Sequence, residues 1–224
     1  MDLKLSIRLN EKLFLRDPES SDLGRRILKS GIELIYKLGF EAFTFKKLAE
    51  EIKTTEASVY RYFENKHRLL LYIITWYWSY LEYQVVFSIN NMTDVETKIR
   101  CVIDLLSREL DDTLGTIEFD KKALYNIVIS ESSKAYLSKE VDQNNEAQLF
   151  KPYKDLCGRI ADLFSTYNAD YPYPHSLAST VIEAAHFQYF FAQHLPRLTD
   201  VKNNKSEEVI KSFLEHLVFS TLAH

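Results

Sequence analysis

The sequence predicts an all-α protein. Its 224 residues include only five Gly and five Pro, so few residues interrupt long helices. Apolar side chains recur at the spacing of one helix face, and they make up much of the 46% of residues that are hydrophobic. A chain of this length and composition can bury a sizeable core in one large domain, or in a small and a medium one.

A short helix is expected to begin after Thr44, whose hydroxyl can accept a hydrogen bond from an unpaired backbone N–H. Apolar residues then follow at positions i, i+3, i+4 and i+7, which form one helix face: Phe45, Leu48, Ala49 and Ile52.

A second short helix follows the turn at Lys53 and Thr54, with Val59 and Phe63 on its inward face. Its opposite face is small, polar or basic and has an aromatic residue on either side. These residues are Thr54, Ala57, Ser58 and Arg61, with Tyr60 and Tyr62 beside them. Such a pair is typical of a helix-turn-helix, in which the second helix enters the DNA major groove. The alternative is a surface helical hairpin with a solvated polar face.

Hydroxyl and cationic side chains around this pair suit contacts with DNA phosphates, which position a protein without reading sequence. The candidates are Thr44, Lys46, Tyr60, Tyr62 and Lys66. A second set of side chains could reach the base edges: Thr55, Ser58 and Arg61. Arginine can bond guanine through two hydrogen bonds, and Ala57 could touch a thymine methyl group.

Residues 25–71 resemble the N-terminal DNA-binding domain of TetR-family transcriptional regulators. The resemblance rests on RRILKSGIELIYKLGFEAFTFKKLAEEI, followed by TEASVYRYFENKHRLL. The Val59–Phe63 block and the Asn65-Lys66 pair stand at the family's usual spacing. The family often has Gly or Ala-Gly in the turn with Val after it, where this chain has Ile52-Lys53-Thr54, and it often has Gly at the position of Ala57. These two departures leave the base contacts open. Beyond about residue 70, only length and helical character match.

The resemblance implies three parts: an N-terminal extension (1–21), a three-helix helix-turn-helix domain (22–68), and a larger helical domain for ligand binding and dimerisation (69–224). It implies a homodimeric repressor that a small-molecule inducer releases from a palindromic operator. An alternative is a regulator or activator controlled by a protein partner, without an inducer. A third possibility is an interaction or enzyme module in which the helix-turn-helix is only structural.

The charge distribution agrees with a local DNA contact. Residues 1–68 carry 14 Lys and Arg against 11 Asp and Glu, whereas the whole chain has a net charge of −4. Because this excess of positive charge is modest, we expect a dimer that spans two half-sites to gain affinity.

The N-terminal extension has alternating apolar residues from Leu3 to Leu9, and a helix-start signal at Asp17-Pro18. One interpretation is an arm that contacts DNA or a partner through its basic residues: Lys4, Arg8, Lys12 and Arg16. We favour the other interpretation, a tail packed on the domain.

Six further helices are expected at about 66–89, 94–112, 119–136, 148–167, 175–195 and 205–222, with a polar stretch at 138–146 that could form a short helix. The last two are the expected dimer element, with a twofold four-helix interface. Its residues would be Leu177, Val181, Ala185, Ile210, Phe213, Leu214 and Leu217. The alternative is that these faces close the core of the monomer.

The C-terminal part is rich in aromatic residues, which suits an apolar or planar ligand held by a few polar groups. The candidate ligand-binding residues are Tyr125, His186, Tyr189, Phe190 and Gln193.

Several classes of function lack support in the sequence. His186 and His194 are eight residues apart, too far for a helical metal-binding pair, and there is no Cys/His cluster. No phosphate-binding Gly loop or hydrolase motif occurs, so we expect neither an enzyme nor a cofactor. There is no signal peptide pattern, and the longest uncharged run, from Leu69 to Leu81, is too short to span a bilayer. We therefore expect a cytoplasmic protein without a membrane partner.

Overall fold

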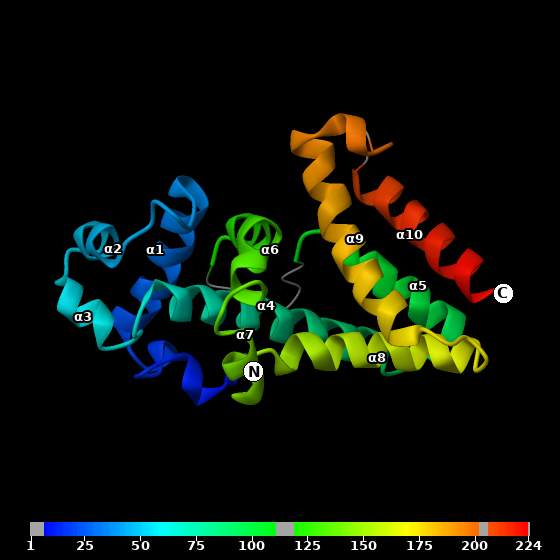
Figure 1. Cartoon of the computed structure of the whole chain (residues 1–224), viewed down its shortest axis with the longest axis horizontal. Helices are drawn as coiled ribbons and strands as arrows, with labels where there is room; N and C mark the ends of the chain where they lie inside the picture. Colours follow the sequence, from blue (N-terminus) through cyan, green and yellow to red (C-terminus); the bar gives the residue numbers. More distant parts are fainter. Residues whose placement is uncertain (1–6, 111–118, 202–205, 224) are drawn as a thin grey trace. The chain divides into compact units, whose positions relative to one another are not determined.

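The structure, a computed structural model, describes residues 7–110, 119–201 and 206–223. Within these residues it is all-α, which confirms the predicted fold class (Figure 1). The α-helices are α1 (Asp22–Leu38), α2 (Phe45–Glu51), α3 (Glu56–Tyr60), α4 (Lys66–Ile89), α5 (Val95–Leu106), α6 (Lys121–Tyr136), α7 (Val141–Glu146), α8 (Lys151–Tyr167), α9 (Pro174–His194) and α10 (Ser206–Leu222). Short 3-10 turns occur at η1 (Glu11–Leu13), η2 (Pro18–Ser20) and η3 (Pro196–Leu198).

Most of the expected helices lie where the sequence placed them, and α4 has the predicted bounds. The helix expected at 94–112 is wrong at its C-terminal end, because α5 stops at Leu106. There the Ser107 hydroxyl donates to Ile103 O at 2.6 Å, and the Ser107 N–H also bonds the last turn. Residues 111 and 112 lie outside the described ranges.

The chain divides into two compact units. Unit 1 contains residues up to Tyr80 together with Leu110–Pro152, and unit 2 contains Leu81–Glu109 and the chain from Tyr153 onward. The helix-turn-helix therefore shares a unit with the first part of α4, with α6 and with α7. The functional boundary expected after residue 68 is a different kind of division and stays a prediction.

Unit 1 is built around aromatic side chains. Its largest fully buried residues include Phe40, Phe43, Phe63, Trp78 and Tyr125. Helix α1 packs against α2, α6 and η2, and α2 packs against α3. Ser, Thr and Asp side chains cap the N-termini of α1, α2, α3 and α6, so each helix begins where its sequence supplies an acceptor.

Residues 7–20 of the N-terminal extension are called the N-terminal strap. Leu13 is fully buried, and the Leu15 N–H donates to Tyr62 O at 2.8 Å. The Asn10 side-chain amide donates to Ala147 O at 2.9 Å. For these residues, the expectation of a tail packed on the domain is confirmed.

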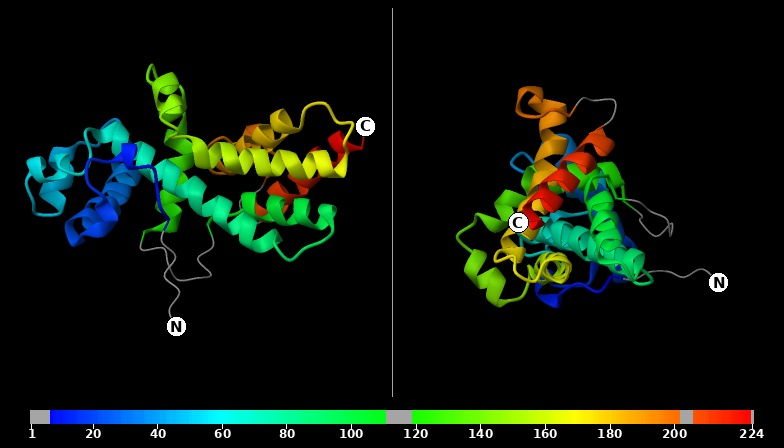
Figure 2. Two further views of the ribbon diagram at one scale, coloured as in Figure 1. Left: turned by 90° about the horizontal axis from the view of Figure 1, so that it is seen from below. Right: turned by 90° about the vertical axis from the view of Figure 1, so that its right-hand side faces the viewer.

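Unit 2 combines α5, α9 and α10 with the second parts of α4 and α8. Helices α9 and α10 lie side by side (Figures 1 and 2). Ion pairs join α5 to α10, with Arg100 2.6 Å from Glu215 and Lys211 2.7 Å from Asp104. None of the helices in the described ranges combines the length and apolar character needed to cross a membrane.

The contact of α1 with η2 predicts the effect of a glycine substitution. A Cβ atom on Gly24 would lie 2.1 Å from the Pro18 carbonyl oxygen, which is backbone and cannot rotate away. We expect Gly24→Ala to lower the free energy of unfolding by about 1–3 kcal/mol, measured by urea denaturation.

Gly158 on α8 is the matched control, because a Cβ atom added there would meet nothing within 4 Å. Gly158→Ala should raise the free energy of unfolding by roughly 0.5–1 kcal/mol. Equal stability of Gly24→Ala and the native protein would contradict the packing of η2 on α1.

Candidate nucleic-acid interface

Helix α3 is a single short turn fixed from inside and from its N-terminus. Val59 is fully buried below it. The Thr55 hydroxyl accepts the Ser58 N–H at 3.2 Å and also forms a hydrogen bond with the Ser58 hydroxyl at 2.8 Å. The predicted base-contacting residues thus fall on α3 and its two caps: Thr55, Ala57 and Arg61 are exposed and Ser58 is partly exposed.

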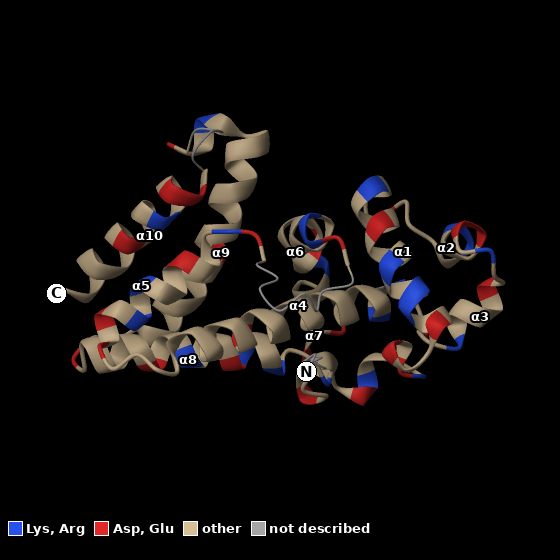
Figure 3. Ribbon diagram, turned by 180° about the vertical axis from the view of Figure 1, so that it is seen from behind, with Lys and Arg blue, Asp and Glu red and all other residues tan. Residues whose placement is uncertain are grey.

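Three of the predicted phosphate contacts lie on or beside this surface. Thr44 is exposed while its hydroxyl caps α2 at Lys47, and Lys46 is exposed on the same helix. Tyr60 is 46% exposed, and its ring packs edge-to-face on Phe45 with the centroids 5.0 Å apart. Figure 3 shows basic segments on α1, on α2 and near the turn before α3, interspersed with acidic ones.

Tyr62 lies on the inner side instead. It is 2% exposed, and its hydroxyl forms a 2.8 Å hydrogen bond with the Ser21 hydroxyl, which caps α1. The Arg16 guanidinium of the strap covers the ring at 5.3 Å from its centroid. This burial argues against the phosphate contact expected of Tyr62.

The Lys66 side chain forms hydrogen bonds with the loop between α1 and α2. Its ammonium group donates to the carbonyl oxygens of Phe40, Glu41 and Phe43 at 3.0, 3.2 and 3.3 Å. An ammonium group has three donors, so these bonds use its full capacity. The structure therefore argues against a phosphate contact by Lys66 and gives it a structural role.

The turn before α3 has no glycine, and its left-handed position is occupied by a lysine. Lys53 has φ +52°, a left-handed conformation that costs a non-glycine residue about 1–2 kcal/mol. The Thr54 N–H donates to Ala49 O at 2.9 Å, and the Arg26 guanidinium donates to Ile52 O. These two bonds hold the turn from both sides.

The candidate ligand-binding residues fall in both units. Tyr125 is buried on α6 in unit 1, whereas His186, Tyr189, Phe190 and Gln193 lie on α9 in unit 2. Burial lowers the pKa of His186 to about 4, so this residue is neutral at pH 7. The Tyr189 hydroxyl donates to Glu109 at 2.6 Å; burial and this carboxylate raise the pKa of Tyr189. Gln193 is exposed.

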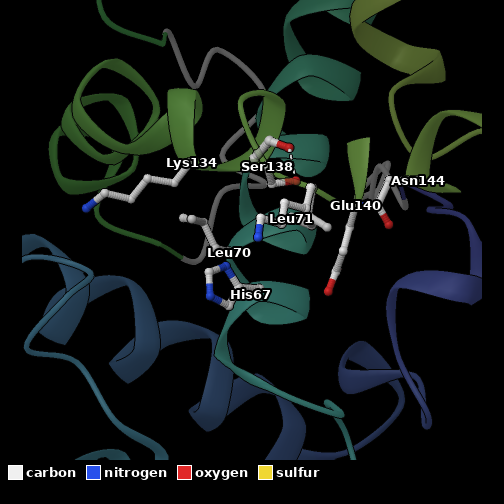
Figure 4. Close-up of a pocket in the computed structure, with 9 residues that line it drawn as sticks. His67, Leu70, Leu71, Lys134, Ser138, Glu140 and Asn144 are labelled. Atoms are coloured by element: carbon white, nitrogen blue, oxygen red, sulfur yellow. Dashed lines mark hydrogen bonds between the residues drawn. The ribbon is translucent and has the colours of Figure 1, made fainter. Parts of the chain in front are cut away.

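A small cavity of about 140 Å³ lies in unit 1 between the start of α4 and the α6–α7 connection. Figure 4 shows His67, Leu71, Ser138, Glu140 and Asn144 around it. None of the candidate ligand-binding residues lines this cavity. Within the described ranges, no cluster of three His, Cys, Asp or Glu side chains could hold a metal ion.

Most of the predicted dimer residues belong to the core of unit 2. Those buried within one chain are Leu177, Val181, Ala185, Ile210 and Leu214. Of the predicted set, Phe213 is 41% exposed and Leu217 is partly buried. The exposed apolar surface of α9 instead carries Phe187, which is 51% exposed. The predicted face thus serves mainly the monomer, as the alternative allowed.

Comparison with known proteins finds one family model that matches the N-terminal part of the chain. Residues 27–73 match the family model described as "Bacterial regulatory proteins, tetR family". The chain thus carries at residues 27–73 a domain similar to the N-terminal domain of TetR-family regulatory proteins.

One relative is the Bacillus subtilis (strain 168) protein named "Uncharacterized HTH-type transcriptional regulator YerO". It is 35% identical over 71 residues, which are 32% of this chain and only 22% of that protein. The sequence match therefore concerns about a third of this chain and less than a quarter of that relative.

Solved structures resemble the chain over a longer range. AibR, in complex with isovaleryl coenzyme A and operator DNA, is 20% identical with a TM-score of 0.61, over 87% of this chain and 97% of that one. The fatty acid degradation regulator FadR from Bacillus halodurans is 14% identical with a TM-score of 0.62, over 87% and 96%. A transcriptional regulator from Saccharomonospora viridis in complex with choline is 16% identical with a TM-score of 0.59, over 87% and 94%. At these identities, the likeness concerns the fold.

The contacts of Lys66 predict a stability effect. Lys66→Ala removes the donor for three loop carbonyls, so we expect the free energy of unfolding to fall by about 1.5–3 kcal/mol in urea denaturation. Lys46→Ala removes an exposed cation and should change it by less than about 0.5 kcal/mol. Equal values for the two variants would contradict the structural role of Lys66.

Proposed function

We propose that this chain is a transcriptional regulator that binds DNA through the exposed face of α3. The supporting observation is that Ala57 and Ser58 on this short capped helix and Arg61 at its C-cap all reach solvent, with Ala57 and Arg61 exposed and Ser58 partly exposed. Arg61 would bond a guanine edge, and small neighbours would let the helix approach the bases. Thr44, Lys46 and Tyr60 would contact phosphates and fix the orientation.

The functional form in this proposal is a homodimer on a palindromic operator. A single α3 offers few base contacts, so two copies on two half-sites would supply affinity and specificity. We place the interface on the exposed apolar side of α9 and α10, where Phe187 stacks on Phe191 with centroids 5.7 Å apart and Phe213 is exposed. Large exposed aromatic side chains are typical of protein interfaces.

The proposal includes a cytoplasmic repressor that a small apolar or aromatic ligand releases from DNA. Two neighbours of the same fold were solved with isovaleryl coenzyme A or choline. In this chain, α9 carries the buried His186 and Tyr189 among apolar residues, and the Tyr189 hydroxyl donates to Glu109, which lies after α5. Such groups could orient a ligand whose preference for one conformation shifts the population away from DNA binding. A regulator controlled by a protein partner, or an activator, is the alternative.

DNA binding is tested by fluorescence anisotropy with the DNA upstream of the chain's own gene, against unrelated competitor DNA and over a salt titration. Arg61→Ala should weaken specific binding by about 1–3 kcal/mol, because it removes a base contact. Lys46→Ala should instead lower the slope of log affinity against log salt concentration by about one per protomer, because one phosphate contact is lost. Lys122→Ala, an exposed cation on α6, is the control and should bind like the native protein. Equal affinity of Arg61→Ala and the native protein would refute the role given to α3.

The interface is tested by sedimentation velocity. The double variant Phe187→Glu, Phe213→Glu should sediment as a monomer, because each change would bury a charge in the proposed interface. Phe87→Glu is the matched control, since Phe87 is 66% exposed on α4 in the same unit and should leave the dimer intact. A dimeric double variant would place the interface elsewhere.

A further inference from the structure

A buried carboxylate on α6 contacts the helix-turn-helix. Glu131 is 8% exposed and lies 91 positions along the chain from Phe40, whose backbone N–H donates to Glu131 Oε1 at 3.2 Å. Its other oxygen lies 2.7 Å from the Lys134 ammonium group. No residue of the TetR-family match, 27–73, lies on α6, so the sequence match does not account for this contact.

A buried carboxylate is costly unless its oxygens are paired. Here one oxygen accepts a backbone amide and the other faces a lysine. Lys134 also reaches Glu41 at 3.0 Å, so a single ammonium group links α6 to the loop that carries Phe40. The hydrogen bond and positive charge of Lys134 lower the pKa of Glu41. Burial alone would lower the pKa of Lys134, but its bonds to both carboxylates outweigh burial and raise it.

The loop between α1 and α2, residues 39–43, is thereby held from two sides. Lys66 at the start of α4 holds three of its carbonyl oxygens, and Glu131 holds its Phe40 amide. The buried Phe40 ring has the Lys66 ammonium 4.6 Å and the Lys134 ammonium 5.6 Å from its centroid. These contacts tie the loop to both α4 and α6.

The loop sets the start of the DNA-contacting region. It ends at Thr44, the N-cap of α2, and the next residue, Phe45, packs against the ring of Tyr60 on α3. A displacement of Phe40 would therefore reach Tyr60 along the chain to Phe45 and then through the Phe45–Tyr60 ring contact.

We propose that Glu131 is a positioning residue for DNA recognition. Its carboxylate fixes the Phe40 amide and, through the loop, the placement of α2 and Tyr60, although it touches no DNA itself. The proposal rests on the proposed function. It makes α6 part of the support of the helix-turn-helix, so that a change in α6 would alter DNA affinity at the recognition surface.

The test combines hydrogen exchange with DNA binding in the full chain. Glu131→Ala removes the acceptor for the Phe40 amide and the partner of Lys134. Glu131→Gln keeps an acceptor oxygen but removes the charge, and it serves if the alanine variant does not fold. Glu41→Gln is the matched control, because it removes a carboxylate from the same lysine at a position 80% exposed.

We expect Glu131→Ala to speed amide exchange in residues 39–45 and to weaken binding to the upstream DNA, each by about tenfold or more, since a hydrogen bond to a charged group is lost. Glu131→Gln should show smaller changes in the same residues. Glu41→Gln should stay within about twofold in both measurements, as exposed ion pairs contribute little.

Three results would overturn the proposal. One is unchanged exchange at residues 39–45 in Glu131→Ala and Glu131→Gln. Another is an equal rise across buried helices such as α1, α4 and α8, which would indicate a general role in stability. The third is native DNA affinity in a variant whose loop exchanges faster. Failure of the native protein to bind DNA would instead remove the proposed function, and this proposal with it.

Discussion

The three hydrogen bonds from Lys66 to the α1–α2 loop are the constraint on which the DNA-facing part of this protein depends. A lysine in the first turn of a helix is disfavoured by the helix dipole, so its position at the start of α4 requires compensation. The loop carbonyls provide it by accepting hydrogen bonds from the Lys66 ammonium group. The loop leads into Thr44, which caps α2, and Phe45 of α2 packs against the ring of Tyr60 on α3. The exposed face of α3 thus depends on Lys66, whose own side chain is turned to the loop.

Local sequence predicted the elements of this region well, because the signals that start its helices are short-range. Thr44 caps α2 as expected, and the apolar residues of α2 lie inward. The roles of Tyr62 and Lys66 could not be predicted in the same way. Tyr62 turns inward to Ser21, and Lys66 turns to carbonyls more than twenty positions earlier. Periodicity gives the face of a helix, but a side chain at the edge of that face is directed by tertiary partners.

The C-terminal helices show a second limit of the same kind. Both α9 and α10 are apolar on more than one side, so spacing alone could not separate the core face from an interface face. The structure separates them: Val181, Ile210 and Leu214 are fully buried in one chain, while Phe187 and Phe213 remain exposed. Glu131 was not singled out from the sequence, since one acidic residue on a helix carries no signal. Only the structure shows that Glu131 is buried and that it accepts a hydrogen bond from the Phe40 amide, 91 positions away.

The central claim is that the exposed face of α3 recognises a DNA sequence, and in vitro selection from a random double-stranded DNA pool tests it most directly. The account predicts enrichment of two inverted half-sites separated by about one helical turn or a multiple of it. It also predicts that Arg61→Ala selects the same site with one position in each half relaxed, because a single base contact is lost. A pool that shows no enriched sequence with the native protein, or an identical motif with the variant, would contradict the claim.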